Sequence, residues 1–232
     1  MKSLARTLMV FAVTALLAAC AGGKVVEESQ YSGFLKDYSQ LKAEKDANGQ
    51  PVMRYLSPKL TSGAYSKVMI DRVEFYPAPK EDKDVTWATL YQIRDYFDMQ
   101  LRKKVGEQVP VVNEAGPGVV RLRVALTAVK SETASLKAWQ YIPIALVVQG
   151  AKAAAGTRAK DAELYVEMDI LDSQTGQRLG AVVKSGTGTE IKEMKEGAEK
   201  GEKMVTLADV EPVLDNWAEL VANFAGRNLR PH

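Results

Sequence analysis

Three carboxylates, Glu163, Glu167 and Asp169, lie four and two residues apart in a stretch where apolar and polar residues alternate. Successive side chains of a strand point to opposite faces, so this spacing places all three on one face. Paired carboxylates are the catalytic groups of most glycosidases, and glycan chemistry beside Tyr165 is therefore one hypothesis for this face. A solvated sheet face explains the same pattern without a ligand, and we favour that interpretation.

The residue types that carry most other enzyme chemistry are nearly absent. The chain has one histidine, His232 at its end, and one cysteine, Cys20. A nucleophile usually needs a base beside it, and transition-metal sites draw on several histidines and cysteines. The sequence therefore predicts no catalytic residues, no metal site and no cofactor, with a metal bound by oxygen ligands alone as the one alternative. We expect a protein that is not an enzyme.

Cys20 follows a leader with three parts. Lys2 and Arg6 give it a basic start, residues 7–17 are mostly apolar, and Ala18 and Ala19 precede the cysteine. This is the layout of a secretory signal peptide over residues 1–19, and its apolar part is too short to span a bilayer. Leu17-Ala18-Ala19-Cys20 also resembles the bacterial lipobox, which implies cleavage between Ala19 and Cys20 and lipidation of Cys20. The alternative is an incidental thiol in a leader that is cleaved elsewhere.

The residue after the cysteine predicts where the exported chain is located, and the charge balance limits the partners it can bind. Ala21, in place of aspartate, implies sorting to the outer membrane, where a lipid-anchored domain would face the periplasm. Each buried acyl methylene contributes roughly 0.8 kcal/mol, so several chains make a stable anchor. Two of the 31 basic residues precede Cys20 and all 29 acidic residues follow it, so the exported part is electroneutral. Nucleic acid is therefore not expected as a partner.

The exported part has the composition of one globular domain. We expect a lipidated cysteine and tether over residues 20–32, then a single domain over 33–232. Residues 37–58 lack a clear period and are expected to be mostly loop, with ordered structure from about residue 68. Residues 190–204 are rich in Glu and Lys and predict a mobile surface segment, or alternatively a solvated helix.

Apolar periodicity predicts the elements. Alternation indicates strands near residues 68–76, 109–113, 119–128, 163–170 and 179–184, with a hairpin turn at 172–176. Spacings of three and four predict a helix from Thr86 to Gly106 and a last helix that begins near Asp209 and stops at Gly226. This order predicts an α+β fold, a two-layer sandwich whose mainly antiparallel sheet carries amphipathic helices on one face.

An apolar stretch at residues 141–148 contains Pro143 and is too short to span a bilayer. A small core helix or buried crossover would explain it. As an exposed patch it would instead be the candidate partner-binding surface, with Tyr141, Ile142, Ile144 and Val147 as its contact residues.

Several motifs together resemble the bacterial lipoproteins that carry domain of unknown function 3313. They are the lipobox, Ser32-Gly33-Phe34-Leu35 followed by Tyr38, the Gly116-Pro117-Gly118 turn running into 119–126, Pro143, and Asp172–Gly176. The resemblance spans most of the exported chain and implies its location and domain unity, but it transfers no catalytic residue. The order of elements is also similar to α+β domains of accessory envelope lipoproteins.

Three functional hypotheses follow. The leading one is an outer-membrane lipoprotein that acts as a non-enzymatic binding or assembly accessory and docks an envelope protein. The alternative is a periplasmic glycan or peptidoglycan binder, or weak hydrolase, acting through Tyr165, Glu167 and Asp169. The third is a structural lipoprotein that makes no specific contact.

Overall fold

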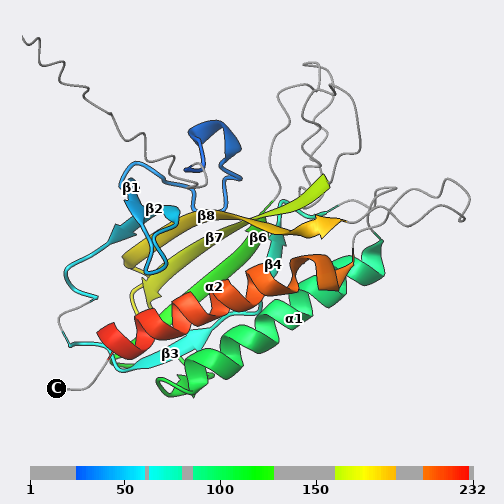
Figure 1. Ribbon diagram of the computed structural model, residues 1–232. Helices are drawn as coiled ribbons and strands as arrows, with labels where there is room; N and C mark the ends of the chain where they lie inside the picture. The colour runs from blue at the N-terminus through cyan, green and yellow to red at the C-terminus, as the bar shows by residue number, and fades with distance from the viewer. Residues whose placement is uncertain (1–24, 61–62, 80–85, 128–159, 192–205, 230–232) are drawn as a thin grey trace, which may run out of the picture.

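The computed structural model describes residues 25–60, 63–79, 86–127, 160–191 and 206–229 (Figure 1). Its elements in chain order are the 3-10 turn Glu28–Gln30, β1 (Lys42–Lys45), β2 (Pro51–Leu56), β3 (Lys67–Ile70), β4 (Glu74–Tyr76), α1 (Trp87–Gly106), β5 (Val111–Val112), β6 (Val119–Thr127), β7 (Lys160–Asp172), β8 (Arg178–Ile191) and α2 (Leu207–Asn228). The predicted α+β class is confirmed.

All eight strands form one sheet in the order β1-β2-β8-β7-β6-β3-β5, with β4 also paired to β6. The neighbouring pairs β1–β2, β2–β8, β8–β7 and β7–β6 are antiparallel. The pairs β3–β6, β3–β5 and β4–β6 are parallel. The parallel edge arises because α1 carries the chain from β4 back to the same end of the sheet, and parallel neighbours need such a crossover.

The two helices pack side by side on one face of the sheet, as Figure 1 shows. The helix that begins after Thr86 is confirmed, and the hydroxyl of Thr86 accepts a hydrogen bond from the Thr89 amide at 3.2 Å. The last helix is longer than predicted. It begins at Leu207, after a capping box between Thr206 and Asp209, and continues through Pro212 to Asn228. Gly226, predicted as its stop, is buried inside the helix instead.

The opposite face of the sheet is also covered, which the two-layer prediction did not include. Residues 25–41, here called the strap, lie across it on the side away from the helices (Figure 1). A second small core joins the two layers; it contains Val26, Phe34 and Leu35 of the strap with Ala125, Tyr165, Ala181 and Val183 of the sheet. The predicted tether extends to Ser32, whereas Val26 is already buried.

The N-terminal third of the domain differs most from the prediction. Residues 37–58 were expected to be mostly loop, but they form the hairpin of β1 and β2, which extends the sheet beyond β8. All four residues of β1 are exposed, so this edge strand shows no apolar alternation by which its sequence would reveal it. β8 continues to Ile191, and the segment expected to be mobile lies almost entirely outside the described residues.

Candidate functional site

The carboxylate face singled out in the sequence is a buried structural site. Glu167 is fully buried, and its carboxylate accepts hydrogen bonds from the Ser32 amide at 2.7 Å and from the Tyr38 hydroxyl at 2.6 Å. The expectation of a solvated face is wrong for Glu167, because the strap covers it. The same cover keeps its carboxylate from any glycan.

Asp169 has a similar structural role. Its side chain is 7% exposed and pairs with Arg178, whose Nε lies 2.8 Å from the carboxylate. Arg178 also donates to the backbone oxygens of Leu35 and Asp37, at 2.5 and 2.7 Å. These bonds fasten the strap to the sheet. The side chain of Glu163 lies outside the described part of the chain.

The other predicted site residues also lie outside the described residues. They are Ala19 and Cys20 of the cleavage and lipidation site, and Tyr141, Ile142, Ile144 and Val147 of the candidate partner-binding surface. Both sites therefore stay predictions.

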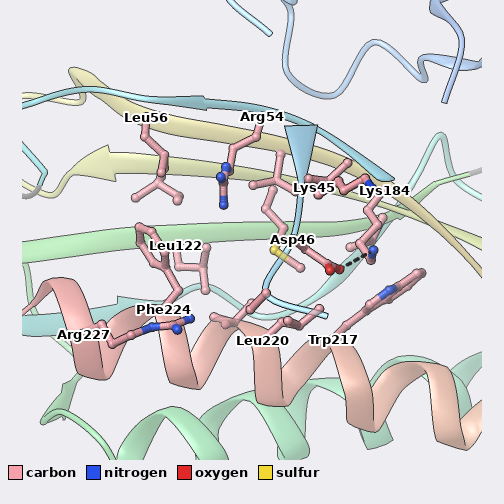
Figure 2. A pocket seen from close by; sticks show the side chains of 17 residues that line it. Lys45, Asp46, Arg54, Leu56, Leu122, Lys184, Trp217, Leu220, Phe224 and Arg227 are labelled. Carbon is pink, nitrogen blue, oxygen red and sulfur yellow. Dashed lines mark hydrogen bonds and ion pairs between the residues drawn. The ribbon is translucent and has the colours of Figure 1, made fainter. Parts of the chain in front are cut away.

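A groove that sequence reasoning missed lies on the helix side of the sheet. Figure 2 shows it between α2 and the strands next to the β1–β2 hairpin. Its volume is about 340 Å³, within the range of small-molecule sites. The lining residues are Lys45, Asp46, Ala47, Val52, Arg54 and Leu56 of the hairpin, Leu122, Val166, Met168, Ile170, Val182 and Lys184 of the sheet, and Trp217, Leu220, Val221, Phe224 and Arg227 of α2.

The groove exists because the helices cover only part of their face. α2 packs on β7 and β8. α1 lies on the side of α2 that is away from β2, over the β3 edge of the sheet, so neither helix covers β2. The side of α2 that faces β2 across the groove therefore has no second helix packed against it. As a result Leu220, Val221 and Phe224 are only half-buried, as are Leu56 and Val182 on the strands.

A buried ion pair closes one part of the groove. Lys184 Nζ lies 2.7 Å from Asp46 Oδ2, with the two side chains 8% and 9% exposed. The other oxygen, Asp46 Oδ1, accepts from the amides of Asn48 and Gln50 in the hairpin turn. The pair therefore ties the hairpin turn to β8, beside Trp217 in Figure 2.

The pKa of Asp46 reflects this environment. Burial alone would raise the pKa, but the hydrogen bond from Lys184 and those from the backbone of Gln50 and Asn48 outweigh it, and the pKa is lowered from its ordinary value. Asp46 is thus held as a carboxylate, and the pair carries no net charge.

Apart from this ion pair, the charged residues that line the groove are basic. Arg54 pairs with Glu44 through Nε at 2.9 Å, whereas Arg227 is exposed and has no carboxylate partner among the described residues. Lining the groove are four basic residues and one acidic residue, around a mostly apolar interior. Such a surface suits an apolar ligand that carries negative charge.

In the sequence, Val52, Arg54 and Leu56 occupy every second position, the spacing of one strand face, and this was the available signal for the hairpin wall of the groove. Over the described ranges, no group of three His, Cys, Asp or Glu residues is arranged to hold a metal ion. No described helix has both the length and the apolar character needed to cross a membrane.

Comparison with known proteins gives a family and relatives. The family model described as "Protein of unknown function (DUF3313)" matches residues 30–221. The "Uncharacterized lipoprotein YdcL" of Escherichia coli K12 is 33% identical over 175 residues, covering 75% of this chain and 78% of that protein. The same protein from Escherichia coli O157:H7 matches equally.

Two solved structures align over much of the chain at low identity. The PelC dodecamer of Paraburkholderia phytofirmans is 10% identical with a TM-score of 0.35, covering 77% of this chain and 96% of that chain. The hypothetical protein CT253 of Chlamydia trachomatis is 8% identical with a TM-score of 0.38, covering 71% and 98%.

Proposed function

The chain belongs to the DUF3313 family, and from that premise we propose that it is a lipoprotein of the bacterial outer membrane, acylated on Cys20, with its domain in the periplasm. The name of the Escherichia coli relative supports the lipoprotein part of this proposal. The leader that ends in Leu17-Ala18-Ala19-Cys20 supports the site of acylation, and Ala21 supports the outer membrane. Palmitate labelling and membrane fractionation of a Cys20→Ala variant test the anchor: the variant should incorporate no label.

We further propose that the domain acts as a non-enzymatic binding accessory of the envelope. The observation that carries this role is the groove, where half-buried apolar side chains of β2, β8 and α2 face each other across an open space. Partly solvent-exposed apolar side chains that line a groove are characteristic of ligand-binding sites.

Photocrosslinking in cells tests the groove as a binding site. A photoreactive amino acid replaces Leu220 in the groove or, as the matched control, Met99, which is exposed on α1. We expect a crosslinked product at position 220 and none at position 99. Equal products at both positions, or none at 220, would contradict the proposal. A link from 220 to residues 141–148 of the same chain would also contradict it, because the groove would then be an internal packing surface.

The predicted docking of an envelope protein through residues 141–148 is a separate proposal. It rests on the apolar composition of that stretch. Replacing Ile144 and Val147 with Glu should abolish a crosslinked protein complex while the thermal unfolding midpoint stays unchanged. A complex that persists would exclude this stretch as the docking surface.

A further inference from the structure

The ligand class of the groove follows from the arrangement of its apolar and basic groups, and this inference rests on the proposed binding role. Leu220, Val221 and Phe224 form a continuous apolar wall along α2. Leu56 and Val182 face them from the strands. A ligand that removes these five side chains from water gains free energy in proportion to the apolar surface it covers.

The apolar wall runs along α2. Trp217 and Arg227 are ten residues apart on α2, which corresponds to about 15 Å along the helix axis. The Lys184–Asp46 pair lies on the side of Trp217, whereas Arg227 lies toward the C-terminal end of the helix (Figure 2). A single apolar chain suits a volume of about 340 Å³ along this length better than a peptide helix, which is about 10 Å across.

The charge of the groove selects the head group. Lys184 is neutralised by Asp46, Arg54 is paired with Glu44, and Lys45 is exposed on the edge strand β1. Among the described residues of the lining, Arg227 is therefore the guanidinium that is left for a ligand. Its Nε donates to the Asn223 backbone oxygen at 3.1 Å, and its other nitrogens can donate to an anion. A cation beside an apolar channel is complementary to an amphiphile with a negatively charged head.

We propose that the groove binds a single-chain anionic lipid of the fatty-acid class, with the acyl chain along Leu220, Val221 and Phe224 and the carboxylate at Arg227. Arg54 lies on the opposite wall and stays paired with Glu44. The buried Lys184–Asp46 pair offers no unpaired charge, and Lys45 beside it is exposed on β1, so the chain end of the lipid lies on that side.

The test uses the full-length acylated protein in phosphatidylcholine vesicles and a diazirine-bearing C16 fatty acid, with labelled peptides mapped by mass spectrometry. We expect label on the peptides of β2 and α2, competed by palmitate and not by hexadecanol, which lacks the charge. Arg227→Glu should weaken labelling about tenfold, since a charge-assisted bond is replaced by repulsion. Lys103→Glu makes a comparable change of charge on an exposed position of α1 and should leave labelling unchanged.

A second variant keeps the test independent of charge. Val182→Phe fills the groove with an apolar ring and should abolish labelling while thermal unfolding shows that the domain still folds. Label spread evenly over the chain, equal competition by hexadecanol, or labelling that survives both Arg227→Glu and Val182→Phe would overturn the fatty-acid assignment. If Leu220 crosslinks a different envelope component in cells, the binding role stands and only the ligand class is wrong.

Discussion

At the scale of single residues, Lys184 and Asp46 make an ion pair that is more than nine-tenths removed from solvent. Replacing Lys184 with Met leaves the Asp46 carboxylate buried without its cation, which should lower the free energy of unfolding by about 3 kcal/mol. Lys104→Met is the matched control, because Lys104 pairs with Glu219 at the surface and such pairs contribute less than about 1 kcal/mol. Urea denaturation measures both; equal losses would show that the buried pair has no special role.

The same pair should make the stability of the domain depend on pH. The folded-state pKa of Asp46 is lowered, so its contribution is fully present above the unfolded pKa of about 4 and is lost as pH falls through the folded pKa. The stability difference between the wild type and Asp46→Asn should therefore be constant near neutral pH and shrink below about pH 4. A difference that stays constant down to about pH 3 would contradict this role.

Tyr38 connects the strap to the buried carboxylate of Glu167. Its hydroxyl donates to Glu167 at 2.6 Å and accepts from the Gly33 amide at 2.7 Å, and burial together with the carboxylate raises its pKa well above the ordinary value. Tyr38→Phe should reduce stability by about 1–3 kcal/mol, because both partners lose their bond. Amide hydrogen exchange should increase first in the strap. Tyr91→Phe, at a ring that is 46% exposed, is the control and should change neither measurement.

At the scale of elements, two glycines show how closely α2 approaches its neighbours. A Cβ at Gly186 of β8 would lie 2.6 Å from Val213 and 3.0 Å from the Trp217 ring, both on α2. Gly186→Ala should therefore push the helix from the sheet and lower stability by about 1–3 kcal/mol.

Gly226, which lies within α2, provides the comparison for Gly186. A Cβ there first meets the end of the flexible Gln108 side chain, and alanine is favoured over glycine in a helix by about 1 kcal/mol. Gly226→Ala should therefore be close to neutral. Thermal unfolding of both variants checks the comparison, and a larger loss for Gly226→Ala than for Gly186→Ala would show that the contact geometry is misjudged.

The elements that the sequence predicted are those with long, regular patterns. α1, β6 and β7 each carry four or more apolar residues at a constant period, and all of these residues enter the main core. The β1–β2 hairpin was missed because β1 is wholly exposed and β2 is only six residues long. Gly226 was misread as a helix stop because α2 continues through it to Asn228, and the sequence does not distinguish a glycine inside a helix from one at its end.

The candidate site was harder to predict than the fold because it depends on which surfaces remain uncovered. The sequence correctly placed Glu167 and Asp169 on one strand face, opposite Val166 and Met168. It could not show that a strap from more than a hundred residues earlier covers that face. Nor could it show that α2 leaves β2 uncovered, which is the origin of the groove.

At the scale of the whole molecule, the strap limits how the domain sits at a membrane. Cys20, the proposed lipid-bearing residue, precedes the buried Val26 by six residues, a distance of at most about 20 Å. Val26 packs on the sheet face opposite α1 and α2. A lipid on Cys20 would therefore hold the strap side near the lipid surface, and the groove, on the helix side, would lie farther from it.

Spin labels test this orientation, since Cys20 is the only cysteine and single introduced cysteines are unique reporters. Gln40, exposed at the end of the strap, and Met99, exposed on α1, are each replaced by Cys in the acylated protein. In vesicles, we expect a label at position 40 to collide more often with oxygen, which concentrates in lipid, than a label at position 99. Extending the chain with about ten Gly and Ser residues after Ala21 should remove this difference, because a flexible linker lets the domain turn freely. Equal oxygen accessibility without the extension would show that the strap does not orient the domain.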